Sequence, residues 1–288
     1  MYFKSSNKIE IKAFVLLLFI GMTFWFCSKE KRYLVTTEAP TNIKARRVTL
    51  KGLAKSGYRY KIVERGFCYS SDHIPALDDN KTRDTIHSDN SIEIDLKNLK
   101  LNTTYNAFAF SKLNDGTFLL GKMVQFTTNS EFEIGDIGPA NGIVFNKNST
   151  SGAKFRFAEA RPIPNLYSWG CPIYETFADP IGTLTSAWGA EENSNKIALN
   201  CASSNIAAKI CLNLELDNFS DWLLPTGGDL TKMYESNQAG LTDIFKGTYW
   251  SSSEYDAAQG YGINLDGGIW GHYSKSAYLN IMAVRYFN

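Results

Sequence analysis

The sequence predicts two folded domains of different class, an all-β sandwich followed by a mixed α+β domain. Three observations predict this. The 288 residues are too many for one small module and suit two domains of ordinary size. Short segments of alternating apolar and polar residues fill residues 34–129. Residues 131–288 combine strand-like segments with two helical patterns.

The first domain is predicted from its repeated short strands. Alternation with a period of two is typical of half-buried strands, and turn sequences separate the segments. The expected strands are residues 48–53, 60–70, 91–99, 104–113 and 118–128. Strands of this length and spacing favour two packed sheets. His73 and His87 fall in polar loops, where we expect them to be solvated.

Two helical segments are expected in the second domain. Residues 193–216 carry an apolar stripe at helical spacing, and we expect a break near Ser203 and Ser204. The next helix should follow Thr226, because Thr226 and Asp229 have the spacing of a capping box. Beyond Tyr249 the pattern returns to strands.

The N-terminus has the pattern of an export signal. Residues 1–12 contain three lysines, and residues 13–26 are 14 apolar or nearly apolar residues. As a helix they would span about 21 Å, less than a hydrocarbon core of about 30 Å. We therefore expect residues 1–26 to be a signal peptide and residues 27–33 a tether, with an uncleaved membrane anchor as the alternative.

Cys27 resembles the acylated cysteine of bacterial lipoprotein signals, although Phe26 stands where those signals carry a small residue. The resemblance implies an exported protein held in the bacterial envelope by a lipid on Cys27, at the outer membrane and cell surface. Without residues 1–26 the chain has 27 basic and 28 acidic residues. Lipid, rather than charge, would therefore hold it at a membrane.

Export also permits disulfide bonds. The candidates are Cys171, Cys201 and Cys211, and their spacing leaves the pair open. The net charge of +1 argues against nucleic acid as a partner.

Three motifs of the first domain resemble the fibronectin type III-like domains of Bacteroidetes surface proteins. They are ERGFCYS (64–70), LKNLKLNTTYNAFAF (96–110) and VQFTT (124–128). Leu96, Leu99 and Tyr105 stand where such sandwiches turn a corner. The resemblance implies an immunoglobulin/fibronectin III-like sandwich that acts as a spacer.

Six motifs follow in order through the second domain: IGDIGPANGIVF, SWGC, NIAAKIC, SDWLLPTGGDL, YWSSSEY and MAVRYF. Together they resemble the Fibrobacter major paralogous domain family, also called DUF1566. The resemblance implies a C-type lectin-like α+β fold with late strands and loops exposed. The related formylglycine-generating enzymes place paired cysteines late in the domain. No cysteine follows Cys211 here, which argues against that oxidase activity.

Catalysis by the serine run Ser251–Ser253 is not favoured. A nucleophilic serine needs a base and an acid that orients it. The base would have to be His272, with Asp221 or Asp266, and no G-x-S-x-G elbow surrounds the serines. We expect the serines to be framework and the chain not to be an enzyme.

No metal or other cofactor is expected. The chain has no CxxC spacing and only three histidines, which argues against zinc. Calcium takes six to eight oxygen ligands. Asp221, Asp229 and Glu254 are candidates, but no spacing binds them into one site.

The expected binding face is segment 256–281, where aromatic residues stand among small polar ones. Recognition surfaces use this combination, and aromatic rings also stack on sugar rings. The candidate ligand-binding residues are Tyr261, Asn264, Asp266, Trp270, His272, Tyr273 and Tyr278. The sequence predicts a non-catalytic surface protein, an adhesin or scaffold, that binds a glycan or a protein.

Three alternatives stay open. The first is a binding protein diversified by a retroelement that randomises adenines. Most residue types of the segment are reachable from an AAC codon, whereas Gln259, Trp270, Lys275 and Met282 would have to be constant. The others are an enzyme of unknown type and a structural assembly subunit.

Overall fold

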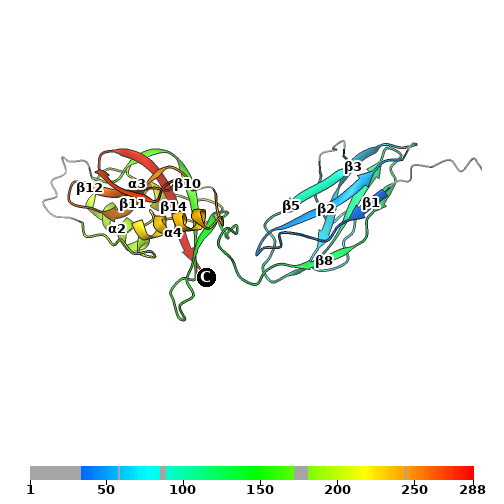
Figure 1. The fold of residues 1–288 in the computed structure, drawn as a ribbon, viewed down its shortest axis with the longest axis horizontal. Helices are drawn as coiled ribbons and strands as arrows, with labels where there is room; N and C mark the ends of the chain where they lie inside the picture. Colours follow the sequence, from blue (N-terminus) through cyan, green and yellow to red (C-terminus); the bar gives the residue numbers. More distant parts are fainter. Residues whose placement is uncertain (1–33, 58, 85–88, 172–180, 244) are drawn as a thin grey trace, which may run out of the picture.

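The computed structural model describes residues 34–288, except 58, 85–88, 172–180 and 244. The expected signal peptide, the lipid site Cys27 and His87 lie outside the described residues. Within the described part, no helix is long and apolar enough to cross a membrane. Figure 1 shows two folded units, one after the other along the chain.

The first unit has two sandwich-like antiparallel sheets, which confirms the predicted all-β class. One sheet has the order β1 (Leu34–Thr37), β2 (Val48–Lys55), β5 (Ser91–Leu96). The other has the order β4 (Asn80–Lys81), β3 (Ile62–Ser70), β6 (Thr104–Leu113), β7 (Phe118–Leu120), and β8 (Val124–Thr127) also pairs with β6. Their inner side chains form one buried cluster that includes Leu50, Phe67, Ile92 and Ala109.

A tyrosine fixes the corner that leads into β6. The buried Tyr105 ring stacks on Phe126 with centroids 5.5 Å apart. Its hydroxyl accepts a hydrogen bond of 2.9 Å from the Lys100 N–H. Leu96 and Leu99 are buried in the same cluster. This is a tyrosine corner, as the resemblance to fibronectin type III-like domains implies.

The strand expected over residues 118–128 is two strands, β7 and β8. Between them, Gly121 approaches β1 so closely that an added Cβ would lie 2.5 Å from the Thr37 Oγ1 atom. The Gly121 N–H bonds the Ala109 carbonyl. The break therefore depends on a contact with a strand far away in sequence, which alternation alone does not reveal.

The second unit contains one six-stranded sheet, against which helices pack (Figure 1). The strands are β9 (Ile143–Lys147), β10 (Phe157–Ser168), β11 (Thr248–Glu254), β12 (Gln259–Asn264), β13 (Ile269–Ser274) and β14 (Tyr278–Phe287). They lie in the order β13-β12-β11-β14-β10-β9, and β11 and β14 are parallel. The mixture of strands and helices agrees with the predicted α+β class.

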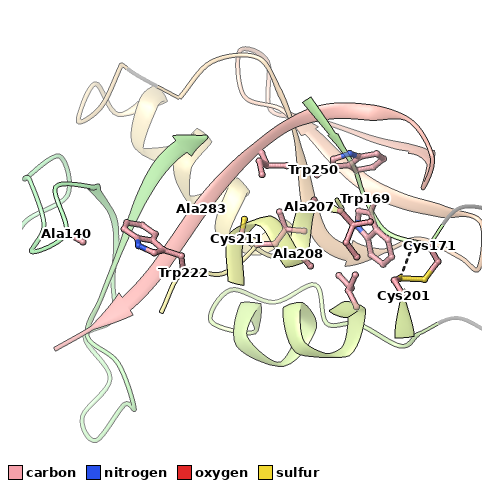
Figure 2. Packing of buried hydrophobic residues seen from close by; sticks show 14 residues of the cluster. Ala140, Trp169, Cys171, Cys201, Ala207, Ala208, Cys211, Trp222, Trp250 and Ala283 are labelled. Carbon is pink, nitrogen blue, oxygen red and sulfur yellow. Dashed lines mark hydrogen bonds between the residues drawn. A yellow bond between two sulfur atoms is a disulfide. The ribbon is translucent and has the colours of Figure 1, made fainter. Parts of the chain in front are cut away.

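Alternate residues of β14 join apolar clusters on opposite faces of this sheet. Ile281 and Ala283 belong to the cluster around Trp222 and Trp250 (Figure 2). Met282 and Val284 belong to the cluster that contains Leu230 and Met233. Because side chains alternate along a strand, both faces of the sheet are covered by protein at its centre.

The predicted helices are present, although the first helical segment begins and ends at other residues than predicted. The segment predicted over 193–216 is two helices, α2 (Ala190–Asn200) and α3 (Ala207–Leu212), with the expected break between them. The next helix, α4 (Gly227–Gln238), begins after the N-cap Thr226. A full capping box is present, since the Thr226 side chain accepts from the Asp229 N–H and the Asp229 carboxylate accepts from the Thr226 N–H.

The structure selects one disulfide from the three candidate cysteines. Cys171 and Cys201 are bonded, beside Trp169 (Figure 2). Cys211 and Cys68 are free and buried. Burial raises the pKa of the Cys68 thiol to about 11 and that of Cys211 well above its ordinary value. Neither free thiol is therefore reactive at neutral pH.

We expect removal of the disulfide by Cys171→Ala with Cys201→Ala to lower the free energy of unfolding by about 2–4 kcal/mol. The bond closes a loop with a sequence separation of 30 residues, and this restricts the unfolded chain. Urea unfolding measures the change. With reductant present, wild type and double variant should approach each other, and a gap that persists would contradict the cross-link as its cause.

The two units also contact each other directly. The Arg46 guanidinium donates hydrogen bonds of 3.0 Å to the Gly138 carbonyl and 3.2 Å to the Pro139 carbonyl. Lys44 lies 3.8 Å from the Asp136 carboxylate. Buried Ala45 packs in a cluster with three phenylalanines of the second unit, Phe132, Phe157 and Phe287. The glycine-rich segment IGDIGPANGIVF therefore forms part of the interface between the two units, here called the joint.

We expect Arg46→Ala to loosen this joint by about 1–3 kcal/mol, because two hydrogen bonds between the units are lost. Rotational correlation times from nitrogen-15 relaxation should be similar for the two units in wild type and diverge in the variant. Lys51→Ala is the matched control, since Lys51 pairs with Glu93 inside the first unit. Unchanged correlation times in Arg46→Ala would show that the joint does not depend on this side chain.

Candidate binding surface

Three of the predicted ligand-binding residues meet on one face of the β12–β13 hairpin. In the antiparallel register Tyr261 pairs with His272, and Ile263 pairs with Trp270. Directly opposite residues of an antiparallel pair point to the same face. Ile263 lies on the same face and is buried, at 1% exposure. The hairpin thus sets Tyr261, His272 and Trp270 side by side above the core.

Tyr255, the residue directly after β11, completes a row of four rings with Tyr261, Trp270 and His272, here called the aromatic surface. The Tyr255 and His272 rings stack at 4.2 Å. Tyr255 meets Tyr261 edge to face at 5.3 Å, and Tyr261 meets Trp270 edge to face at 5.2 Å. These are favourable ring geometries. Tyr255 is 48% exposed and Trp270 42%, so the row faces solvent.

Small and polar neighbours fix the orientation of these rings. The Trp270 indole lies on Gly227, where an added Cβ would be 2.2 Å from its Cη2 atom. The His272 Nδ1 atom is 2.9 Å from the Gln259 Oε1 atom, within hydrogen-bond distance. Gly227 therefore provides a seat that a larger residue would fill, and the ring of His272 is held from its side.

A buried ion pair lies under the end of the row. Lys275 and Glu254 bond each other, and both side chains are 3% exposed. Lys275 also donates to the Ala257 carbonyl at 2.9 Å and lies 4.7 Å from the centre of the Trp169 ring. Glu254 accepts from the Gly182 N–H at 3.0 Å. The pair braces the chain on both sides of Tyr255.

The other predicted site residues lie outside the row. Tyr273 is on the opposite face of β13, edge-on to Trp250 at 5.8 Å. Asn264 and Asp266 shape the hairpin turn, because Asn264 accepts from the Asp266 N–H and Asp266 accepts from the Gly247 N–H. Tyr278 is 61% exposed on β14, which two strands, β12 and β11, separate from β13.

The three serines of β11 are fully buried and hydrogen-bonded. Ser251 donates to the Tyr261 carbonyl at 2.8 Å and Ser253 donates to the Leu184 carbonyl at 2.7 Å. Ser252 accepts from Asn193 at 3.1 Å. These contacts agree with the predicted framework role. The possible acid Asp221 pairs with Arg285 instead of His272.

A different serine and histidine do meet, in the first unit. The Ser70 Oγ atom is 3.2 Å from His73 Nδ1, and His73 Nε2 is 2.9 Å from Asp79. Ser70 is only 4% exposed, and its oxygen also accepts from the Asp72 N–H. A buried oxygen engaged in a turn offers no approach to a substrate. His73, predicted to be solvated, is half-exposed and lies within hydrogen-bond distance of Asp79.

No group of three or more histidine, cysteine, aspartate or glutamate side chains in the described part of the chain is arranged to hold a metal ion. The three carboxylates considered for calcium lie in separate contacts. Asp221 bonds Arg285, Glu254 bonds Lys275, and Asp229 accepts from Tyr286. The structure does not bring them together.

Fold and surface define a two-domain, mostly β-sheet protein. No known protein family and no curated protein matches the chain. Among solved structures, the sensor domain of the anti-sigma factor RsgI4 of Pseudobacteroides cellulosolvens is 15% identical, covering 34% of this chain and 96% of that one (TM-score 0.25). The fibronectin type III domain of human fibronectin type III domain containing protein 3 is 18% identical, covering 40% and 99% (TM-score 0.27). That of human KIAA0970 is 20% identical, covering 45% and 88% (TM-score 0.26).

Proposed function

We propose that the chain is a non-catalytic binding protein of the bacterial cell surface, which takes a glycan or protein ligand on its aromatic surface. The continuous, half-exposed row of four rings carries this proposal. Rings held in place by Gly227 and Gln259 lose little freedom when a ligand binds, and such preorganisation favours affinity. Aromatic anchors also dominate binding energy at many interfaces.

The charges around the rings favour a neutral or cationic ligand. Residues 255–274 contain no lysine or arginine, and their only acidic residues are Asp256 and Asp266. An anionic ligand would meet no positive charge from this stretch of the chain. A sugar ring, which presents C–H groups to an aromatic face and hydroxyls to carboxylates, suits this combination.

The wider architecture belongs to the same proposal. A lipid on Cys27 anchors the chain, the first domain spaces it from the membrane, and a C-type lectin-like second domain presents the rings. Support for a binding role over an enzymatic one comes from Ser251–Ser253, whose hydroxyls are buried and engaged. Retroelement diversification would have to spare Trp270, a member of the aromatic surface.

We expect Trp270→Ala to weaken ligand binding at least tenfold, since truncation of an aromatic anchor costs about 2 kcal/mol or more. Glycan arrays and pull-downs identify the ligand, and titration then compares the variants. Tyr278→Ala is the matched control, because it removes an exposed ring outside the row, 61% exposed against 42% for Trp270. Equal losses in both variants, or no ligand from any source, would contradict the aromatic surface as the site.

Gly227→Ala tests the same site without altering a ring. The added methyl group must displace Trp270, so we expect affinity to fall by about tenfold while the four rings stay present. In a Trp270→Ala background the same change should have little further effect, which a double-mutant cycle measures. Additive losses would show that Gly227 acts elsewhere.

A further inference from the structure

β13 is an unprotected edge of the second sheet. It is last in the strand order, so no described strand pairs with its outer side. Its sequence, Ile-Trp-Gly-His-Tyr-Ser, holds no lysine, arginine, carboxylate or proline. Ile269 is 66% exposed. Edge strands usually carry charges, prolines or bulges that prevent pairing with another chain, and β13 has none of these.

The other described edges are protected. β5 carries Glu93 and Asp95, and β4 is two residues long. β7 and β8 share an edge that is interrupted at residues 121–123. β9 ends in Lys147 and is bridged to Ile137 on its outer side. In β1, the Thr37 side chain accepts a hydrogen bond from β6. Among the described sheet edges, β13 therefore differs from the others in lacking such protection.

The strand is complementary to itself. When a strand pairs antiparallel with its own copy, opposite residues must share a face, so a two-fold axis passes through one residue. An axis at Gly271 places Trp270 opposite His272 of the second copy, on the face of the aromatic surface. It also places Ile269 opposite Tyr273 of the second copy, on the other face. Both are apolar or aromatic pairs of the kind that stabilises sheets.

We propose that β13 pairs antiparallel with β13 of a second copy of this chain, so that the two sheets become one. Charge permits this association. The paired strands are uncharged, and the chain from residue 27 holds 27 basic and 28 acidic residues, so the copies do not repel each other. Pairing covers Ile269 and joins the two aromatic surfaces across the axis. The dimer does not depend on the proposed ligand, but it would make binding bivalent.

Sedimentation of residues 28–288, which include both folded units, tests the pairing. Wild type should show a concentration-dependent monomer–dimer equilibrium. Ile269→Lys should weaken dimerisation at least tenfold, because a lysine on an edge strand opposes pairing with another chain and its ammonium group would have to lose water when the strands pair. Leu199→Lys is the matched control, since Leu199 is 86% exposed on α2 and should leave the equilibrium unchanged.

Cysteine cross-linking tests the register. Gly271→Cys sets two thiols opposite each other at Cα distances of about 4.5–5.5 Å, within disulfide range, and should cross-link rapidly on mild oxidation. Ile269→Cys sets its thiols four residues apart along the strands, about 13 Å, and should not. The three atoms nearest an added Cβ at position 271 all belong to the Tyr273 side chain, with the hydroxyl oxygen first at 2.7 Å, so this ring must shift to admit the cysteine. Cys68 and Cys211 are buried and should stay reduced.

A chain that sediments as a monomer at every concentration, with no cross-link through position 271, overturns the proposal. A monomer that instead binds an extended peptide along β13 also overturns it, and assigns the edge to a peptide partner. Loss of ligand binding in Trp270→Ala bears only on the proposed function, because dimerisation is measured without ligand.

Discussion

We expect the Asp229→Ala substitution to lower the free energy of unfolding of the second domain by about 3–5 kcal/mol, since each unsatisfied buried donor costs about 1–3 kcal/mol. Asp229 is fully buried. Its carboxylate accepts hydrogen bonds from the Trp188 N–H (3.2 Å), the Thr226 N–H (3.0 Å) and hydroxyl (2.8 Å), and the Tyr286 hydroxyl (2.7 Å). Alanine leaves these buried donors without an acceptor, which is the expensive case for hydrogen bonds. Urea unfolding followed by circular dichroism measures the loss.

Tyr286→Phe separates the hydroxyl from the rest of the network. It removes one donor and leaves the other three bonds to Asp229, so we expect a smaller loss, about 1.5–3 kcal/mol. Tyr286 also packs its ring against Trp188 and Phe155, and phenylalanine preserves that packing. If Tyr286→Phe lowers the free energy of unfolding as much as Asp229→Ala does, then the hydrogen bond from the Tyr286 hydroxyl alone accounts for the stabilisation.

The same carboxyl group gives stability a definite pH dependence. Burial raises the pKa of Asp229 above its ordinary value, and the hydrogen bonds from Tyr286 and Thr226 oppose this only in part. The folded state therefore binds a proton more tightly than the unfolded state. The stabilising contribution is complete below the unfolded pKa of about 3.9 and is lost as pH rises through the folded pKa.

Urea unfolding over a pH series isolates this contribution when wild type is compared with Asp229→Asn, which cannot titrate at this position. The stability of wild type relative to the variant should fall as pH rises above about 4. A difference that stays constant, or that increases with pH, would show that the pKa of Asp229 is not raised in the folded state.

Local patterns in the sequence predicted the elements, whereas contacts between distant segments had to come from the structure. The spacing of Thr226 and Asp229 predicted the start of α4, because both capping partners lie within one helical turn. The spacing does not reveal that Asp229 is buried, since its other partner Tyr286 comes from β14. Similarly, alternation predicted β6 but not the break at Gly121, which depends on β1.

The sequence predicted which kinds of residue form the binding surface, but not which individual residues belong to it. Aromatic residues among small ones indicated the hairpin, and Tyr261, Trp270 and His272 do meet there. Tyr255 was not among the predicted members, because it lies just outside segment 256–281. Only the folded chain brings its ring onto His272. Tyr273 resembles the others in sequence, but it follows His272 directly and so points to the opposite face of β13, where it packs on the apolar cluster that contains Trp250.

The second large effect is expected at Lys275, which was not among the predicted ligand-binding residues. Lys275→Met should lower the free energy of unfolding by about 3–5 kcal/mol, because it leaves the buried Glu254 carboxylate without its cation. Since Glu254 precedes Tyr255 directly, the change should also displace the end of the aromatic surface and weaken ligand binding. Urea unfolding and ligand titration measure the two effects.

A paired substitution distinguishes an uncompensated charge from a loss of packing. If the cost of Lys275→Met arises from the carboxylate left behind, then adding Glu254→Gln removes that charge, and stability should recover by more than half. The glutamine still reaches the Gly182 N–H that Glu254 bonds at 3.0 Å, so ligand binding should return with stability. If the double variant is as unstable as Lys275→Met alone, the lysine acts through its contacts with Trp169 and the Ala257 carbonyl. In that case the ion pair is not what positions Tyr255.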